Sequence, residues 1–308
     1  MQVTRALEPF LPYRLCRRLL PSGLMGLSAT LLKATALELA ILTGHLLLYP
    51  SGIVQERRGG TAPVLPPDGG AARAGGVEEP ARLPTQAPPP VVLLHGFIDN
   101  RSVFVLLRRS LAQHGRHRVE SLNYSPLTCD IRIAAELLGR HIEEICQRTG
   151  SSRVDVVGHS LGGLIARYYV QRLGGDARVR TLVTLGTPHA GTRVAPLANA
   201  HPIVRQMRPG SEVIEELSRP APGCRTRFVS FWSDLDHLMV PLEAARLDHP
   251  DLLAENVQVS GIGHLALPVH PAVATGIRDA LDGDGAAADA TPGAPGTPGA
   301  HTGDLTVA

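Results

Sequence analysis

Short apolar runs alternate with helical patterns between residues 91 and 281. The apolar runs predict buried strands, whereas apolar residues spaced three and four positions apart predict amphipathic helices. The predicted strands are 91–94, 117–124, 154–157, 179–185, 228–232 and 257–259, and the predicted helices are 102–113, 131–147, 161–173 and 269–281. This alternation predicts an α/β fold with a doubly wound, mostly parallel sheet flanked by helices. In such a sheet, reactive residues follow the carboxyl ends of the strands.

The segments outside this region have a different composition. Residues 1–22 form a basic flank that contains Arg5, Arg14, Arg17 and Arg18, and residues 23–50 are mostly apolar. Residues 51–90 are rich in proline and glycine and show no apolar period, which is typical of a linker. Residues 282–308 are similarly biased toward small residues and predict a disordered tail. The folded domain is therefore expected at residues 91–281.

The apolar segment 23–50 has three interpretations. A basic start, an apolar run and the small residues 34–36 are typical of a cleaved signal peptide. An apolar stretch of about 20 residues is also long enough for an uncleaved membrane anchor. The third interpretation is a helix packed on the domain, with the charges of Lys33 and Glu38 directed outward. Because the basic residues come first, the first two interpretations predict a secreted domain or a membrane-anchored one that faces outward.

Composition and charge exclude several classes of function. The 30 basic and 28 acidic side chains leave a formal charge of +2, so no general attraction to nucleic acid is expected. Hydrophobic residues make up 44%, which is enough for a sizeable core. The four cysteines are too few for a disulfide scaffold and lack the paired spacing of a zinc site. We expect neither a metal nor an organic cofactor.

The strongest chemical signal is a Gly-x-Ser-x-Gly sequence at residues 158–162. It follows the predicted strand 154–157 and precedes the predicted helix 161–173, which is the context that a nucleophile elbow requires. Gly158 and Gly162 carry no side chains that would collide in so sharp a turn. Ser160 is therefore the candidate nucleophile. Asp155, inside the strand, is interpreted as structural.

A serine that attacks a carbonyl carbon creates an oxyanion, which needs two fixed backbone donors. One candidate is the N–H of Leu161, the residue after the nucleophile. The other is the N–H of Phe97, because the sequence His95-Gly96-Phe97 follows the first predicted strand and Gly96 permits close approach. His95 itself is interpreted as a structural histidine.

The nucleophile also needs a base, and the base needs a carboxylate that orients it. His264 follows a Gly-x-Gly loop after the last predicted strand, so it is the candidate base. The loop after strand 228–232 contains two acids, Asp234 and Asp236. We favour Asp236 as the partner of His264, with Asp234 as the alternative. His270, which precedes Pro271, is interpreted as a helix-start residue.

Together these residues resemble the α/β-hydrolase superfamily and, within it, the compact bacterial lipases and esterases of the triacylglycerol lipase type. The resemblance covers about residues 91–280 and includes four motifs and the Asp236 loop: His95-Gly96-Phe97, the elbow 158–163, Gly186-Thr187-Pro188-His189-Ala190-Gly191-Thr192, and Gly261-Ile262-Gly263-His264. The segment 186–192 is the most family-specific part, and His189 in it is interpreted as structural.

The resemblance implies hydrolysis of carboxylic esters through an acyl-enzyme on Ser160, with His264 and Asp236 completing the triad and an acyl ester or lipid as substrate. An acyltransferase or a lipid-remodelling hydrolase would use the same triad and remains an alternative. Residues 193–223 lie between the family-specific loop and the next strand. They are interpreted as a small lid, a wall of the acyl site or an ordinary crossover. A membrane surface is a further possible partner, through residues 23–50.

Overall fold

The computed structural model describes residues 33, 35–44, 47–48, 50, 87–97, 99–124, 130–193, 201–283 and 304–305. Seven strands form one sheet in the order β2-β1-β3-β4-β5-β6-β7, and every neighbouring pair is parallel. The strands are β1 (Val91–Leu94), β2 (Val119–Leu122), β3 (Val154–His159), β4 (Val179–Leu185), β5 (Arg227–Ser233), β6 (Leu253–Val259) and β7 (Asp304–Leu305). The predicted parallel α/β fold is confirmed.

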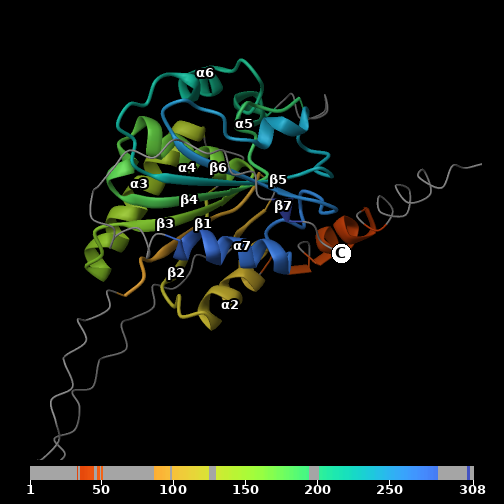
Figure 1. The fold of residues 1–308 in the computed structure, drawn as a ribbon, viewed down its shortest axis with the longest axis horizontal. Coiled ribbons are helices and arrows are strands. Elements are labelled where there is room, and N and C mark those ends of the chain that lie inside the picture. Colours follow the sequence, from red (N-terminus) through yellow and green to blue (C-terminus); the bar gives the residue numbers. More distant parts are fainter. Residues whose placement is uncertain are drawn as a thin grey trace, which may run out of the picture.

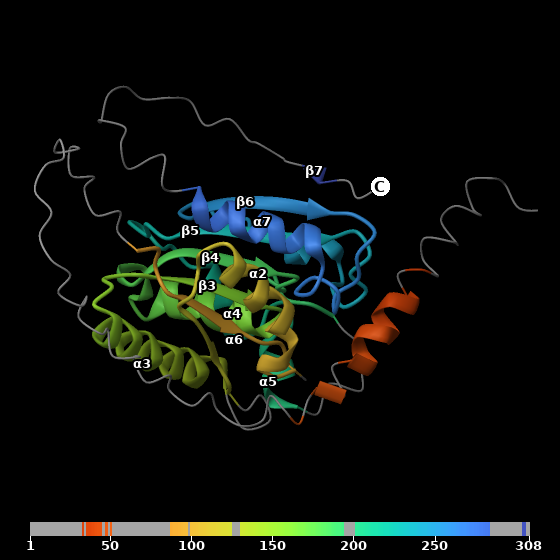
Figure 2. The same ribbon diagram turned by 90° about the horizontal axis from the view of Figure 1, so that it is seen from below.

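Helices cover both faces of the sheet (Figure 1). On one face lie α3 (Ile131–Thr149), α4 (Leu161–Arg172), α5 (Pro202–Gln206) and α6 (Glu212–Ser218), and on the other lie α2 (Val105–Gln113) and α7 (Pro271–Asp282). Figure 2 shows the same two layers from a second side. Among the described residues, three short 3-10 turns complete the elements: η2 (Arg101–Phe104), η3 (Gly175–Ala177) and η5 (Leu242–Ala245).

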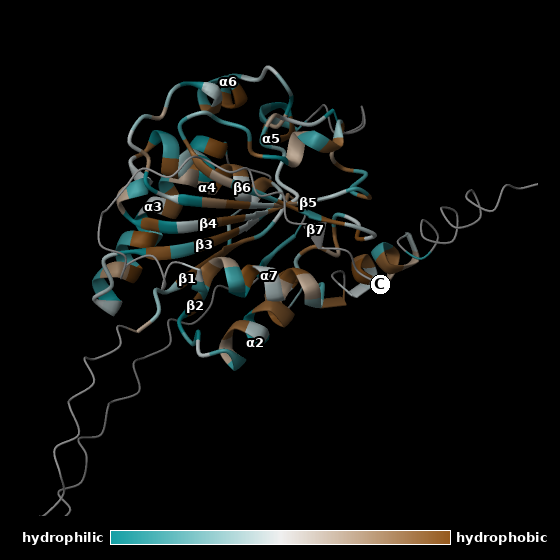
Figure 3. Cartoon of the chain, viewed as in Figure 1, coloured by the Kyte–Doolittle hydropathy of each residue, from teal (hydrophilic) through white to brown (hydrophobic). Residues whose placement is uncertain are grey.

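The core follows the alternation of side chains along the strands. Val92 and Leu94 of β1 belong to the apolar cluster under α3 and α4, whereas Val91 and Leu93 belong to the cluster under α2 and α7. A strand whose successive side chains enter two different cores has to be apolar throughout, because both of its faces are buried. This explains the continuous apolar runs, which are brown in the strands of Figure 3.

Local signals determine where the helices begin and end. The side chain of Asp130 accepts a hydrogen bond from the Arg132 N–H at 2.6 Å and caps α3, which ends at Gly150 with φ of 71°. His270 caps α7 in the same way through the Ala272 N–H, so the interpretation of His270 as a helix-start residue is confirmed. Predicted and observed helix bounds therefore agree within a few residues.

Two strands differ from the expectation. β6 begins at Leu253 rather than at residue 257. The sequence did not indicate the first residues of this strand, because Leu253, Ala254 and Glu255 are exposed and show no apolar pattern. β7 lies within the segment interpreted as a tail, and it pairs with Gln258 and Val259 of β6. The rest of the predicted tail from residue 284, and most of the predicted linker, lie outside the described residues.

The N-terminal helix, defined here as residues 35–44, lies on the side of the domain to which the strand arrows point (Figure 2). Ile41 packs against the apolar cluster under α2 and α7. In the structure these residues form a helix that packs on the domain, as the third interpretation expects. Among the described residues, no helix has the length and hydropathy needed to cross a membrane. The basic flank 1–22 and residues 23–32, 34, 45–46 and 49 of the apolar segment lie outside that part of the chain.

A buried ion pair near the amino ends of β3 and β4 explains Asp155. Its carboxylate is fully buried and accepts hydrogen bonds from Arg116 at 3.0 Å and from Arg180 at 2.7 Å and 2.9 Å. Arg116 also donates to the carbonyl of Leu281, in α7. The carboxylate thus joins two strands and a helix at the end of the sheet opposite to Ser160, in agreement with the structural interpretation.

We predict that Asp155→Ala lowers the free energy of unfolding by about 3 kcal/mol, because it leaves the buried Arg116 guanidinium without its buried carboxylate. Glu255→Ala is the matched control, since Glu255 pairs with Arg227 on the surface, and it should cost less than about 1 kcal/mol. Urea denaturation followed by circular dichroism measures both. Equal losses in the two variants would contradict this account.

Candidate active site

Ser160 occupies the turn between β3 and α4 in a strained conformation. Its φ is 51° and its ψ is −117°, and it is the one non-glycine residue with positive φ among the described residues. Such a conformation costs on the order of 1–3 kcal/mol and persists where surrounding packing imposes it. Ser160 is only partly buried, so the turn presents a reachable hydroxyl at the edge of the sheet.

Two glycines impose this turn by allowing close backbone contact. A Cβ on Gly158 would lie 2.6 Å from the Cα of Gly163, and a Cβ on Gly162 would lie 2.4 Å from the carbonyl oxygen of Leu94. Side chains at either position would push α4 away from β1 and β3. The prediction of a strand, a sharp turn and a helix around Ser160 is confirmed.

The two candidate oxyanion donors lie on either side of Ser160. Leu161 is the first residue of α4, so its N–H has no acceptor within the helix. The loop after β1 also reaches the elbow, because a Cβ on Gly96 would lie 3.5 Å from the Ser160 Cβ. Phe97 follows directly, and its ring meets His201 edge-on at 5.1 Å. The structure thus places both donor residues next to Ser160.

The candidate base and acid are in direct contact. The Nδ1 of His264 donates a hydrogen bond to the Oδ2 of Asp236 at 2.7 Å. The Oδ1 of Asp236 accepts from the Leu238 N–H at 3.0 Å, which fixes the carboxylate. Both side chains are at most 5% exposed, so the interaction is shielded from water.

Asp234, the alternative acid, points elsewhere. Its Oδ1 accepts a hydrogen bond from the Gly261 N–H at 3.0 Å, in the loop that leads to His264. It therefore connects two loops at the surface and does not contact the ring of His264. Of the two acids, the structure pairs Asp236 with His264.

Opposing effects act on the pKa of His264. Burial disfavours the charged imidazolium and lowers the pKa, but the neighbouring Asp236 carboxylate favours it, and the carboxylates of Glu38 and Asp99 act in the same direction. The result is a pKa raised above the ordinary 6.5 of histidine. With Nδ1 donating to Asp236, the ring nitrogen Nε2 is the one that can exchange a proton.

His159 lies between the elbow and the base, a contact that the sequence did not indicate. Its ring centroid is 4.8 Å from that of His264, and its Nε2 donates to the His264 carbonyl at 3.2 Å. Its Nδ1 is 3.5 Å from the Oδ2 of Asp99. Burial, only partly opposed by Asp99, lowers the pKa of His159. A neutral His159 thus connects Ser160 to the loop of His264 without repelling a charged His264 ring.

The loop after β4, residues 186–192, contacts both Ser160 and the Asp236–His264 pair. The hydroxyl of Thr187 donates to the Ser160 carbonyl at 3.0 Å. Gly186 has φ of 53°, and a Cβ there would lie 2.8 Å from Asp236 Oδ2 and 3.0 Å from His264 Nδ1. Glycine at this position therefore permits the acid and the base to approach β4. The expectation that this loop lines the site agrees with these contacts.

The other histidines named above are held by structural contacts. His95 stacks on Tyr124 with ring centroids 4.4 Å apart, and burial lowers its pKa. His189 contacts Thr184 at 3.0 Å and Arg167 at 3.4 Å, and burial followed by the Arg167 charge lowers its pKa well below 6.5. Neither contacts the Asp236–His264 pair through a hydrogen bond in the described part of the chain.

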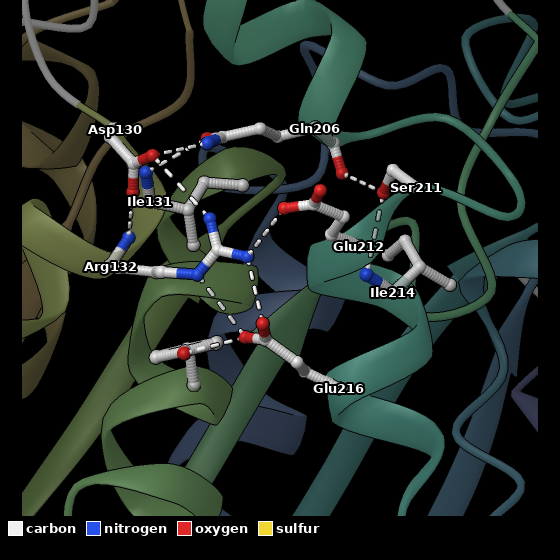
Figure 4. A network of polar contacts seen from close by, with 9 residues as sticks. Asp130, Ile131, Arg132, Gln206, Ser211, Glu212, Ile214 and Glu216 are labelled. Atoms are coloured by element: carbon white, nitrogen blue, oxygen red, sulfur yellow. Dashed lines mark hydrogen bonds and ion pairs between the residues drawn. The ribbon is translucent and has the colours of Figure 1, made fainter.

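The segment with three interpretations, residues 193–223, contains α5 and α6 and is fastened to α3. Arg132 donates to Glu216 at 2.8 Å and to Glu212 at 3.3 Å, and the Ile131 N–H donates to Gln206 at 2.9 Å (Figure 4). With His201 against Phe97, these contacts favour a fixed wall beside the site over a lid. Residues 194–200 lie outside the described part of the chain.

Comparisons with known proteins agree with this architecture. A family model described as alpha/beta hydrolase fold matches residues 89–208. Triacylglycerol lipases from Pseudarthrobacter phenanthrenivorans and Burkholderia plantarii are each 30% identical to the chain over 114 residues. Those alignments cover 34% of this chain and 35% and 31% of the two lipases, so the chain spans about a third of the length of the curated relatives it matches.

Solved structures show the same fold. The mature form of a Bacillus licheniformis lipase superimposes with a TM-score of 0.55 at 18% identity, covering 66% of this chain and 96% of that one. Aspergillus fumigatus lipase B gives a TM-score of 0.57 at 20% identity, covering 64% and 53%. The sheet, the elbow and these matches together show an α/β-hydrolase fold, and triacylglycerol lipases are among the proteins that this chain resembles.

Proposed function

We propose that the chain is a serine hydrolase of carboxylic esters, with acyl esters or lipids as substrates. The observation that carries the proposal is the buried hydrogen bond between His264 and Asp236, which lies at the same edge of the sheet as the strained Ser160. An oriented base and a partly exposed serine at a helix N-terminus are the parts that acyl transfer needs. The lipases among the relatives support an ester as substrate.

In this mechanism the Ser160 oxygen attacks the ester carbonyl carbon, and the Nε2 of His264 takes the hydroxyl proton. Asp236 stabilises the imidazolium that forms and keeps the ring in the required tautomer. The N–H groups of Phe97 and Leu161 bind the oxyanion, and the positive end of α4 favours its charge. His264 then gives the proton to the leaving alcohol. Water, activated by the same ring, hydrolyses the acyl-enzyme and releases the acid.

The acyl chain would leave the site along the side formed by α5 and α6. Phe97 and His201 meet there, and the buried Ile203 and Val204 of α5 give that side an apolar character. Because the ion pairs of Arg132 hold α6 in place, we propose a preformed site that needs no large movement to open. Short and long acyl esters then differ mainly in how much apolar surface they bury.

Substitutions at the triad test this proposal with p-nitrophenyl butyrate and palmitate as substrates of the full chain. Ser160→Ala should remove turnover, and Asp236→Asn should lower kcat by roughly 1,000-fold or more, because the ring of His264 loses its orienting charge. Asp234→Asn is the matched control in the same loop and should stay within about threefold of the unchanged protein, since the amide oxygen can still accept the surface hydrogen bond from the Gly261 N–H. Serine-independent turnover would refute the mechanism.

The raised pKa of His264 predicts the acid limb of the pH profile. Only the neutral ring can accept the Ser160 proton, so kcat/KM should fall as the pH drops through a value above 6.5. In Asp236→Asn the remaining activity should have its acid limb at lower pH, because the neighbouring negative charge that raises the pKa is gone. Initial rates between about pH 5 and 9 measure both limbs, and identical limbs would contradict this assignment.

A further inference from the structure

The N-terminal helix contacts the loop that carries the candidate base. The carboxylate of Glu38 accepts two backbone hydrogen bonds, from the Leu265 N–H at 3.1 Å and from the Ala266 N–H at 2.9 Å. These are the two residues directly after His264. Hydrogen bonds to a carboxylate are stronger than those between neutral groups, and two of them from consecutive amides define the position of the loop.

The loop is shaped to receive this carboxylate. A Cβ on Gly263 would lie 2.4 Å from the Cδ of Glu38, so a side chain at this position would exclude the acid. Ile41, three residues later on the same helix, packs on the apolar cluster that includes Ile262 and Leu267. Positions three apart share one face of a helix, so a single face both anchors the helix and presents the acid. The expectation that Glu38 points outward is therefore wrong.

The leucines of the helix remain largely exposed to solvent. Leu37, Leu39 and Leu42 are each at least 40% exposed. Burial of these leucines therefore contributes little to holding the helix in place. Among the described residues, Ile41 packs on the core and the Glu38 carboxylate bonds the His264 loop, which makes the acid a specific feature of the docking.

Four groups from separate elements surround the His264 ring. Asp236 follows β5, Asp99 follows β1, His159 ends β3, and Glu38 comes from the N-terminal helix. Burial lowers the pKa of His264, and the carboxylates of Asp236, Glu38 and Asp99 raise it. Glu38 differs from the other two acids because its segment precedes the whole sheet in the chain.

We propose that Glu38 is a positioning residue for His264: its carboxylate fixes residues 263–266 of the loop and thereby the place of the imidazole. The proposal depends on the proposed function only in giving His264 the role of base. It makes the N-terminal helix part of the active site of the α/β-hydrolase domain. Loss or displacement of that helix would leave two amides beside His264 without their acceptor and would lower catalysis.

The first test measures the His264 ring directly and needs no substrate. In the full chain with 13C-labelled histidine, the His264 signal is identified by its loss in His264→Gln, and its pKa is obtained by NMR titration. Glu38→Gln should lower that pKa by about half a unit or more, because a negative charge near the ring is removed. Leu39→Ala, on the exposed side of the same helix, should leave it unchanged.

The second test measures ester hydrolysis by the same variants. Glu38→Gln offers one acceptor oxygen for two amides, so kcat should fall about tenfold with little change in KM, because a base displaced by a fraction of an ångström works poorly. The acid limb should move to lower pH in step with the NMR titration. Glu38→Asp keeps the charge but is one methylene shorter, so it should restore the limb and only part of kcat.

The outcomes separate the possibilities. A purely structural Glu38 would lower the melting temperature and leave the NMR pKa and the acid limb unmoved, which would overturn the proposal. If Glu38→Gln does not fold, Ile41→Ala replaces it as the test, because this substitution weakens the packing of the helix and leaves the Glu38 carboxylate in the chain. An unchanged kcat in Ile41→Ala would also overturn the proposal. A shifted His264 pKa in a chain that hydrolyses no ester would refute the proposed function and leave the coupling to Glu38 intact.

Discussion

The close approach of α4 to the sheet is the constraint on which the site depends. The N-terminus of the helix lies so near β1 that a single Cβ on Gly162 would collide with the carbonyl oxygen of Leu94. This approach forces Ser160 into positive φ and brings the free N–H of Leu161 next to the loop that contains Phe97. A helix displaced by the width of one methyl group would carry Ser160 and Leu161 away from the loop that contains Phe97, so the packing of the turn and the geometry of the site depend on the same contact.

The parallel topology then supplies the other parts. Because all neighbouring strands run in one direction, the residues that follow β1, β3, β4, β5 and β6 meet at one edge of the sheet, although they are spread from residue 97 to residue 264. The strand order also reverses at β1, since β2 lies on one side of it and β3 on the other. The connections after β1 and β3 therefore leave the sheet in different directions, and the space between them is where a site can form. Neither Asp236 nor His264 lies within the residues that the family model matches, so their pairing is an independent observation.

Local patterns in the sequence predict most of this architecture. Buried strands are apolar throughout and the elbow needs its glycines, so both leave a signal within a few residues. Asp234 and Asp236 are two residues apart in one loop, and only the path of the backbone decides which one reaches the base. The contact between Glu38 and Leu265 spans 227 residues, and nothing local distinguishes that acid from one that faces solvent. Long-range contacts of this kind are what sequence patterns cannot predict.

The charges around His264 show why such a contact matters for the chemistry. A buried imidazole resists ionisation, yet in the proposed mechanism His264 has to accept a proton in every acyl transfer. Asp236 offsets much of that resistance through direct contact, and the neutral state of His159 avoids a repulsion that a second imidazolium would add. Glu38 adds negative charge from a segment that lies outside the parallel sheet. Under the proposed role of Glu38, a change in that segment alters the position and the pKa of His264 while the elbow, the strands and Asp236 keep their structure. The properties of the candidate base can therefore change without any change in the conformation of Ser160.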